Sequence, residues 1–403
     1  MDGVSYATRD VAFLWKTENI LKTSTVVGIH AFTGEPTEVR FEEQLLDVRP
    51  ADAGTARTYI APGFIDLQVN GFSGIDYCSP SVTTEQIGAS IQAQFATGVT
   101  RLLPTVITGP ATDMLASIRN LARAKTELGP TGEAIAGLHI EGPHISSEDG
   151  PRGVHPRDNV RPPSLDEFEQ WQEAAGGLVR MVTLAPELPG ACAYIEAVVE
   201  RGVVVSIGHT AASARQIDDA VSAGATMATH LGNATFPTPA KFNTLWNQLA
   251  DDRLSASVIA DGFHLPGSFL TTALRTKTAA RLVLVTDAAS PAGALPGRYR
   301  LGSTEIEMDT EGRVTLADGS RLAGSGLRMD RAVPTMMRLS GATLAEAVSM
   351  ATVNPARLAV IAGRKQGLEA GELADLVEFE QHWDGISVRR VWLAGRIVHS
   401  ALQ

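Results

Sequence analysis

Three side chains of the kinds that bind metals end short apolar runs that lie far apart in this chain of 403 residues. They are Glu141 after AIAGLHI, His209 after VVVSIG and His230 after ATMAT. A catalytic transition-metal site needs about three imidazole or carboxylate ligands and a position left open for water. We therefore predict that these three residues bind one divalent metal ion. Taken singly, each has an ordinary structural alternative, which is a hydrogen bond to backbone or solvent.

Asp287 adds a fourth chemical group, because it follows the apolar run RLVLVT. Burying a carboxylate is costly unless it is paired or has a chemical task. A bound metal ion lowers the pKa of water toward about 7, and a nearby carboxylate can take the proton that this water loses. We predict that Asp287 is the general base and general acid of a hydrolytic reaction. The alternative for this residue is a cap on the turn that begins with DAAS.

These four residues meet only if the apolar runs are parallel strands of one sheet. We count eight such runs, which are GFIDLQV, RLLPTVIT, AIAGLHIE, LVRMVTLAP, VVVSIGHT, ATMATHL, SASVIADG and RLVLVTDA. Stretches with a helical pattern, such as ATDMLASIRNLARAKTELG and SARQIDDAVSAG, lie between most of them. This alternation predicts an α/β fold, a (β/α)8 TIM-type barrel whose strand ends meet at one mouth. Two further helices, DRAVPTMMRLSG and TLAEAVSMATVNPARLAVIAG, are expected after the eighth strand.

The two ends of the chain differ from its middle. Residues 1–60 contain short, broken apolar patches, and residues 363–403 contain two strand-like runs, ADLVEFE and SVRRVWLAGRIVHS. Alternating patterns of this length indicate β-strands. We therefore predict that residues 1–60 and 363–403 together form a small β-sandwich domain, and that residues 61–362 form the barrel.

The bulk composition excludes several classes of protein. With 34 Lys and Arg against 45 Asp and Glu, the formal net charge is −11, which leaves no overall positive field for a nucleic acid. The two cysteines, Cys78 and Cys192, indicate neither a disulfide framework nor a cysteine zinc site. The first residues, MDGVSYATRD, lack the features of a signal peptide, and no apolar run reaches the ~18 residues of a membrane span. We expect a cytoplasmic protein with no nucleic-acid or membrane partner.

A series of motifs runs from about residue 60 to residue 380. In chain order they are APGFIDLQVNG, GLHIEGPH, VTLAPE, SIGHT, ATHLGNA, ADGFH, LVTDA, LAGSGLRMDRAV and NPARLAV…GLEAGELADLV. This series resembles the N-acetylglucosamine-6-phosphate deacetylases of the amidohydrolase superfamily. APGFID occurs in many amidohydrolases, whereas HIEGPH together with GHT and THLGNA is much more specific. The resemblance implies hydrolysis of the N-acetyl amide of N-acetylglucosamine 6-phosphate, giving glucosamine 6-phosphate and acetate.

The resemblance also implies a role for each chemical residue. Glu141, His209 and His230 would bind one divalent metal ion per chain, usually zinc or iron in the family, and Asp287 would be the catalytic acid and base. By ligand chemistry zinc is expected first, with Fe2+, Co2+ and other divalent ions as alternatives. A homodimer that acts on a small amino sugar is implied as well. The residues implied to contact the substrate are His155, Asn233, Ala234 and His264.

The first strand departs from the superfamily pattern. Many amidohydrolases carry a His-x-His pair there for a second metal ion, whereas this chain has Gln68 and Asn70. Neutral amides are poor substitutes for imidazole ligands, so one metal ion is expected instead of two. Two interpretations of the pair stay open, namely hydrogen bonds that organise the barrel mouth and a minor contact with the substrate.

Recognition of the phosphate is the second departure. After THLGNA the family carries an Arg that binds the sugar phosphate, whereas this chain reads TFPTPAKFNTLWNQLADDRLSAS. Lys241 lies close to the position of that Arg and is either a phosphate-binding point charge or a solvated loop residue. Other functions therefore stay open. They are deacetylation of an unphosphorylated or differently substituted N-acyl amino sugar, another amidohydrolase reaction such as that of a cyclic amidase or dipeptidase, and a non-catalytic barrel.

Overall fold

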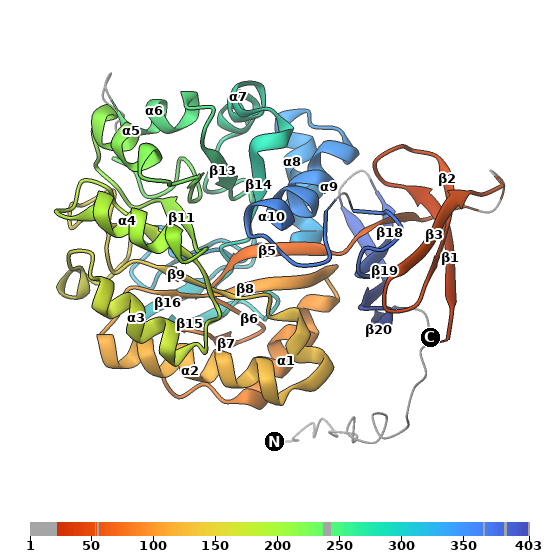
Figure 1. Ribbon diagram of the computed structural model, residues 1–403, viewed down its shortest axis with the longest axis horizontal. Coiled ribbons are helices and arrows are strands. Elements are labelled where there is room, and N and C mark those ends of the chain that lie inside the picture. The colour runs from red at the N-terminus through yellow and green to blue at the C-terminus, as the bar shows by residue number, and fades with distance from the viewer. Residues whose placement is uncertain are drawn as a thin grey trace.

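A closed ring of parallel strands surrounded by helices forms the larger part of the molecule, and a smaller sheet lies beside it (Figure 1). The computed structural model describes residues 22–401, except residues 53, 55, 237–242, 366 and 383–384. The predicted fold class, a (β/α)8 barrel with a small β module built from both ends of the chain, is confirmed.

Eight strands form the barrel, one from each of the eight apolar runs. They are β5 (Phe64–Val69), β8 (Val99–Ile107), β9 (Leu138–Glu141), β10 (Val179–Leu184), β11 (Val204–Ile207), β12 (Met227–Ala228), β13 (Ser255–Val258) and β14 (Leu282–Leu284). Neighbours in this order pair in parallel. A parallel bridge between Val69 and Ala288 joins the end of β5 to the segment after β14 and closes the ring.

Helices follow these strands and cover the outside of the ring (Figure 1). They are α1 (Thr84–Phe95), α2 (Ala111–Glu127), α3 (Leu165–Ala174), α4 (Ala191–Glu200), α5 (Ala214–Ser222), α6 (Thr244–Ala250), α7 (Gly267–Lys277) and α8 (Met329–Ser340). Local capping fixes where several of them begin. At α1 the Thr83 hydroxyl accepts from the Gln86 amide, and the Gln86 side chain accepts from the Thr83 amide. The same reciprocal pair occurs at α5, between Ser213 and Gln216.

The last helical stretch differs from the prediction in one detail. The segment expected as a single helix forms two, α9 (Leu344–Ala351) and α10 (Val353–Leu358). The backbone breaks at Thr352, where φ is −137° and ψ is −78°. Pro355 then lies in the first turn of α10, where its missing N–H leaves no helical hydrogen bond unmade.

Two small antiparallel sheets at the barrel mouth were not predicted. After β5 comes a hairpin of β6 (Gly71–Phe72) and β7 (Ile75–Asp76), and between β14 and α8 come β15 (Gly297–Leu301), β16 (Thr304–Met308) and β17 (Val314–Leu316). The turn between β15 and β16 is Gly302-Ser303, and Gly302 has a φ of +58°, which glycine adopts without strain. Leu301 of this insert packs with Ile107 and Cys78 over the mouth.

The ends of the chain share one mostly antiparallel sheet of seven strands. In spatial order they are β20 (Arg396–Ser400), β19 (Ile386–Leu393), β18 (Leu376–Gln381), β4 (Tyr59–Pro62), β1 (Ser24–His30), β2 (Pro36–Phe41) and β3 (Leu45–Pro50). β2 and β19 are not neighbours in this order, yet the rings of Phe41 and Trp392 meet edge to face with centroids 5.7 Å apart. The sheet therefore bends back on itself, and its two halves pack around a core of their own.

A buried ion-pair network fastens this sheet to the barrel. Asp375, just before β18, accepts hydrogen bonds from Arg101 of β8 at 2.7 Å and from Arg364 at 3.3 Å. Arg364 also donates to the carbonyl oxygen of Gly63, just before β5, at 2.9 Å. Burial alone would raise the pKa of Asp375, but the charges of the two guanidinium groups hold it below its ordinary value. The buried charges are therefore paired, as burial requires.

The chain passes between the two parts at two places. β4 pairs with β18 in the small sheet and leads directly into barrel strand β5, and the second crossing follows α10. We propose that residues 1–60 and 363–403 are one domain and residues 61–362 the other, as the sequence indicates; residues 1–21 and 402–403 lie outside the described part of the chain.

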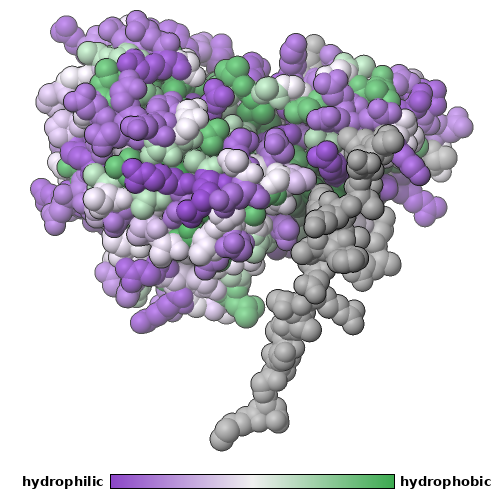
Figure 2. All heavy atoms as spheres, turned by 60° about the horizontal axis from the view of Figure 1, so that its bottom comes forward, coloured by the Kyte–Doolittle hydropathy of each residue, from purple (hydrophilic) through white to green (hydrophobic). Residues whose placement is uncertain are grey.

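The surface reflects the charged composition of the sequence. On the face shown in Figure 2, hydrophilic residues cover most of the area, and hydrophobic ones occur in small, scattered groups. Within the described ranges, no helix is both long and apolar enough to cross a membrane. The large hydrophobic side chains that are exposed come from separate segments, namely Leu46, Trp246, Leu295, Val360 and Ile397.

One carboxyl group of the barrel is buried among neutral hydrogen-bond donors. Asp66 in β5 is fully buried and accepts hydrogen bonds from the hydroxyl and amide of Thr286 and from the amide of Gln68. Burial raises the pKa of Asp66 to about 7. The folded protein therefore holds a proton on this group that the unfolded chain releases near pH 4.

We expect Asp66→Asn to change how stability depends on pH. Because the folded pKa lies above the unfolded one, the wild type loses free energy of unfolding through this group as the pH rises toward 7. Between pH 5 and 8 the loss is about 3 kcal/mol, and asparagine, which does not ionise, avoids it. Urea denaturation at both pH values, in saturating metal, measures this difference. Asp158→Asn, at an exposed position, is the control, and an equal pH dependence of Asp66→Asn and wild type would contradict the assignment.

Candidate metal-dependent active site

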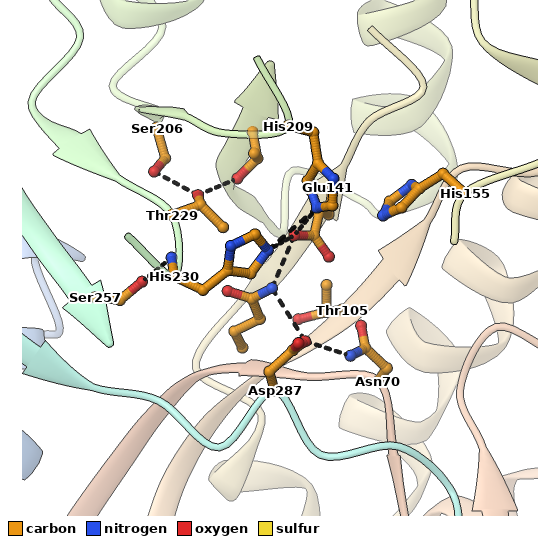
Figure 3. Close-up of polar contacts among 12 residues, drawn as sticks. Asn70, Thr105, Glu141, His155, Ser206, His209, Thr229, His230, Ser257 and Asp287 are labelled. Atoms are coloured by element: carbon orange, nitrogen blue, oxygen red, sulfur yellow. Dashed lines mark hydrogen bonds and ion pairs between the residues drawn. The ribbon is translucent and has the colours of Figure 1, made fainter. Parts of the chain in front are cut away.

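The four residues selected from the sequence lie together at the carboxyl ends of the barrel strands (Figure 3). Glu141 is the last residue of β9, and His209 and His230 each lie two residues beyond the ends of β11 and β12. Asp287 lies three residues beyond β14. All four are buried. Side chains from four separate strands thus form one compact cluster.

Three donor atoms of this cluster converge on one point. The Oε1 atom of Glu141 lies 3.2 Å from Nε2 of His209 and 2.9 Å from Nε2 of His230, and the two imidazole nitrogens are 3.1 Å apart. Ligand atoms around a tetrahedral zinc ion, with bonds of about 2.0–2.1 Å, stand about 3.3 Å from one another. The arrangement therefore fits one divalent ion held by three protein atoms.

The hydrogen bonding of His209 supports a cation at this point. Its Nδ1 lies 3.0 Å from the carbonyl oxygen of Pro151, which can only accept, so Nδ1 carries a proton. In the neutral ring Nε2 then holds a lone pair, and this lone pair faces the carboxylate of Glu141. Two acceptors at this distance repel unless positive charge lies between them, either as a second ring proton or as a metal ion.

The electrostatics of Glu141 lead to the same requirement. Burial raises the pKa of this carboxyl group, but the hydrogen bonds from His209 and His230 outweigh burial and hold it well below its ordinary value. Burial lowers the pKa of His230, but the hydrogen bond and charge of Glu141 reverse that effect and leave it raised. Glu141 is thus an ionised carboxylate that keeps positive charge beside it, which suits a divalent cation.

A chain of hydroxyl groups lies beneath the ligands inside the barrel. The hydroxyl oxygen of Thr229, next to His230, lies 2.6 Å from that of Ser206 and 2.7 Å from that of Thr183. The Thr183 hydroxyl in turn lies 2.7 Å from Nε2 of His139. These connected hydrogen bonds fix the strand ends that carry the ligands.

His155, predicted to contact the substrate, lies beside the same atoms. Its ring centroid is 4.2 Å from that of His209, and Glu141, His155 and His209 form a second group whose ligand atoms all lie within 4.8 Å of one another. Both His155 and His230 are therefore near enough to be the third ligand. The shorter separations favour His230, whose Nε2 is 2.9 Å and 3.1 Å from the other two ligand atoms. We propose that His230 binds the metal and that His155 faces the substrate.

Thr108 orients the ring of His155, a contact that the sequence analysis missed. The hydroxyl oxygen of Thr108 lies 2.7 Å from Nδ1 of His155. Burial, together with His209, holds the pKa of His155 well below its ordinary value, so the ring is neutral. Gly142 makes room for this contact, because a Cβ atom there would lie 2.2 Å from the Thr108 hydroxyl oxygen. Gly142, the glycine of the HIEGPH motif, is therefore needed because a side chain there would displace Thr108 from His155.

Gln68 connects Asp287 to Glu141, and Asn70 holds Asp287 from a second side. The side-chain amide of Gln68 donates to Oε1 of Glu141 at 2.8 Å and to Oδ1 of Asp287 at 3.2 Å. Asn70 donates to the same Asp287 oxygen at 2.8 Å. Both amides therefore organise the mouth by hydrogen bonding, which was one of the two interpretations. Burial, with the charge of Glu141, raises the pKa of Asp287, which favours proton uptake.

The backbone is strained at three of these residues. The φ angles of His209, His230 and Asp287 are +52°, +29° and +48°, in the left-handed region that non-glycine residues rarely adopt. Each such conformation costs roughly 1–3 kcal/mol and persists only where the surroundings enforce it. Strain of this kind gathers at functional sites, and here it falls on the residues selected for chemistry.

The residues predicted to contact the sugar lie on one side of the cluster. His264, beyond β13, is held by Asp261, whose Oδ2 lies 2.6 Å from Nδ1 of the ring. Asn233 and Ala234, beyond β12, line the same pocket as the ligands. Lys241, predicted to bind phosphate, lies outside the described residues.

Comparison with known proteins agrees with this chemistry. Residues 59–398 match the profile of the Amidohydrolase family. The N-acetylglucosamine-6-phosphate deacetylase of Homo sapiens is 35% identical over 380 residues, which cover 91% of this chain and 89% of that protein. This chain belongs to the N-acetylglucosamine-6-phosphate deacetylase family of amidohydrolases.

Two further relatives of this chain have related deacetylase names. The N-acetylgalactosamine-6-phosphate deacetylase of Escherichia coli O157:H7 is 32% identical over 340 residues, covering 84% of this chain and 87% of that one. A mutant N-acetyl-D-glucosamine-6-phosphate deacetylase from Mycobacterium smegmatis, solved in complex with N-acetyl-D-glucosamine-6-phosphate, superposes with a TM-score of 0.85 at 29% identity, covering 94% of this chain and 100% of that one. Amidohydrolases use a divalent metal, and the residues of this deacetylase-family site fit one.

The pocket of this deacetylase-family chain also contains residues that the sequence analysis did not select. They are apolar or small and come from the end of β8, the loop after β9 and the mouth insert, namely Ile107, Gly153, Val154, Leu301, Leu322 and Gly324. The alternation in GRYRL and TEIEM was a signal for strands in the insert. It carried no sign that this sheet folds over the mouth.

Metal analysis of two variants separates the roles of His230 and His155 in this deacetylase family member. We expect His230→Ala to lose its metal on desalting, because it removes one of three ligands. His155→Ala should keep about one metal per chain and lose turnover by roughly 10²–10³-fold, as for loss of an oxyanion donor. Elemental analysis and acetate release measure the two effects, with the partly exposed His382→Ala as the control. Metal loss from His155→Ala, with retention in His230→Ala, would reverse the assignment.

Proposed function

We propose that this chain hydrolyses the N-acetyl amide of N-acetylglucosamine 6-phosphate and releases acetate and glucosamine 6-phosphate. The observation that carries the proposal is the convergence of Glu141, His209 and His230 on one point, with Asp287 linked to it through Gln68. Relatives that match most of the chain are named for this activity, and one solved relative holds this substrate.

The chain supplies a proton carrier next to its metal-binding point. A divalent cation held by the three ligands supplies Lewis-acid activation of water and of the amide carbonyl group. Asp287 takes the proton of the attacking water, for which its raised pKa suits it. The same carboxyl group then gives the proton to the amide nitrogen as the C–N bond breaks. Gln68 and Asn70 donate to Oδ1 of this carboxylate and hold it in place, so that Oδ2 is the oxygen that takes and returns the proton.

Two further side chains are placed to act on the amide. When the Thr108 hydroxyl donates to Nδ1 of neutral His155, the proton of that ring is on Nε2, which then stabilises negative charge on the carbonyl oxygen. Asn70 lines the pocket, and its buried Oδ1 accepts no hydrogen bond within the described part of the chain. That oxygen is available to the N–H of the substrate amide.

The sugar ring is held on the side of β12 and β13. Asp261 accepts hydrogen bonds from the backbone amides of Phe263 and His264 and from the His264 ring, so the ring orientation is fixed and Nε2 is left for a sugar hydroxyl group. Backbone groups of Asn233 and Ala234 supply further contacts from the neighbouring strand end. Lys241 is proposed to bind the phosphate as a point charge.

A second candidate differs only in the sugar. The relative from Escherichia coli O157:H7 is named for N-acetylgalactosamine 6-phosphate, the epimeric substrate. The chemistry at the metal-binding point is the same for both sugars, so only the contacts at the sugar ring distinguish them.

Acetate release from three sugars tests the substrate. We expect the highest kcat/KM for N-acetylglucosamine 6-phosphate, with N-acetylgalactosamine 6-phosphate and unphosphorylated N-acetylglucosamine below it. The preference for phosphate should be roughly 10- to 100-fold, since one charge-assisted contact contributes about 1.5–3 kcal/mol. If Lys241 makes that contact, Lys241→Ala should remove the preference and leave the unphosphorylated rate unchanged. Lys22→Ala, at an exposed position, is the matched control.

The outcomes of this assay separate the parts of the proposal. Stoichiometric metal with no acetate from any of the three sugars would refute the substrate and leave the metal site standing. A faster reaction on unphosphorylated sugar would refute the phosphate and keep the deacetylation.

Replacing Asp287 by Asn should abolish turnover while the metal stays bound. The three ligands are untouched, but the group that carries the proton is lost, which lowers kcat by roughly 10²–10⁴-fold. Metal content and kcat, measured on the same preparation, check both halves of this prediction. Loss of metal from the variant would make Asp287 a ligand instead of the proton carrier.

The proposal also covers the identity of the metal ion, the oligomeric state of the protein and its location in the cell. Two imidazoles and one carboxylate suit zinc, with Fe2+ and Co2+ as alternatives. We also propose a cytoplasmic homodimer, in keeping with two cysteines that are both free. Elemental analysis of protein purified without added metal and light scattering in solution test the first two points.

A further inference from the structure

Apolar side chains form one wall of an otherwise polar catalytic pocket. The wall consists of Ile107, Leu301 and Val154, which belong to or pack against one apolar cluster, whereas the rest of the lining includes the proposed metal ligands and Asp287. The sugar of the proposed substrate presents hydroxyl groups, and its acetyl methyl group is the part that gains from apolar surroundings. The wall therefore matches the acyl end of the substrate.

The order of the barrel strands places this wall opposite the sugar side. β8, which ends at Ile107, is second in the ring and β12 is sixth, so the two lie across the eight-stranded ring from each other. Asn233 and Ala234 follow β12, and His264 follows β13. An amide held at the metal-binding point thus directs its sugar toward β12 and β13 and its acyl chain toward β8.

Ile107 is the member of the wall nearest the chemistry. In the strand register it pairs with the ligand Glu141, and paired residues of parallel strands point to the same face of the sheet. Its side chain therefore faces the barrel mouth beside that ligand. Leu301 of β15 belongs to the same apolar cluster and covers Ile107 from the insert.

A second and larger cavity lies behind Ile107. It measures about 690 Å³, against about 50 Å³ of free space in the catalytic pocket. Cys78, Val106 and Tyr299 are among the residues that line it. Within the described part of the chain, Ile107 is the residue common to both linings. Ile107 thus lies between the catalytic pocket and the larger cavity.

We propose that Ile107, supported by Leu301, is the end wall that restricts this enzyme to short N-acyl groups, and that the cavity behind it accepts longer acyl chains once the wall is cut back. The inference rests on the proposed deacetylase function and adds the residue that sets acyl-chain length. Ile107 acts by excluding the longer chain and takes no part in the proton transfers.

The experiment compares N-acetyl-, N-propionyl- and N-butyrylglucosamine 6-phosphate as substrates of the metal-loaded enzyme. All three release glucosamine 6-phosphate, so one assay of that product serves for each. In the wild type we expect kcat/KM to fall at least tenfold for each added methylene, since that is the range of discrimination for one methylene in an apolar pocket. In Ile107→Ala the ratio of butyryl to acetyl kcat/KM should rise at least tenfold.

Two further variants distinguish a change in acyl-chain selectivity from a general loss of structure. Val106→Ala is the matched control, because Val106 precedes Ile107 on the same strand and lines the larger cavity, yet is absent from the lining of the catalytic pocket. Its ratio of butyryl to acetyl activity should equal that of the wild type. Ile107→Val removes a single methylene and should raise the propionyl ratio even if Ile107→Ala proves unstable. Metal content and thermal midpoint are recorded for every variant.

The outcomes are distinct. An active wild type with unchanged acyl ratios in Ile107→Ala and Ile107→Val overturns the inference and leaves the deacetylase function standing. A wild type that cleaves butyryl and acetyl substrates equally well also overturns it, because no wall then limits the chain. A wild type that releases no glucosamine 6-phosphate from the acetyl substrate refutes the proposed function, and this inference falls with it.

Discussion

A buried carboxylate that faces two imidazole nitrogens is the constraint on which this site depends. Glu141, His209 and His230 bring a carboxylate oxygen and two imidazole nitrogens to one point, where a ring proton or a metal ion must supply positive charge. The barrel holds it together by placing each ligand at the end of a different strand and by fixing those ends through hydroxyl groups below. The left-handed backbone at both histidines shows that these positions are enforced.

The amide of Gln68 extends this constraint to the second carboxylate of the barrel mouth, Asp287. Its nitrogen donates to Glu141 and to Asp287, so the proposed ligand and the proposed proton carrier are held at one relative position. An amide nitrogen presents protons and no lone pair, and it cannot bind a cation. A single side chain therefore connects the two carboxylates by donating N–H groups to both.

Local sequence patterns were sufficient to predict much of the fold and of the candidate site. Each barrel strand lies in a mostly apolar run, and metal-binding residue types at the ends of such runs are the local signal that points to Glu141, His209 and His230. The contact between Thr108 and His155 depends on how two loops pack, and no local pattern encodes that. The mouth insert has strand-like alternation, but its position over the pocket is set by contacts with residues far away in the sequence.

In both the barrel and the small sheet, strands from the N-terminal part of the chain pair with segments from its C-terminal part. The first barrel strand gains its second neighbour from the segment at Asp287 and Ala288, and the residue before this strand is bonded to Arg364, which pairs with Asp375. During synthesis on the ribosome, strand edges therefore stay unpaired until most of the chain has emerged. Long-range closure of this kind generally slows folding and leaves strand edges open to aggregation. The residues at both ends of the described chain are thus constrained by the assembly of the barrel, even though they lie far from the pocket.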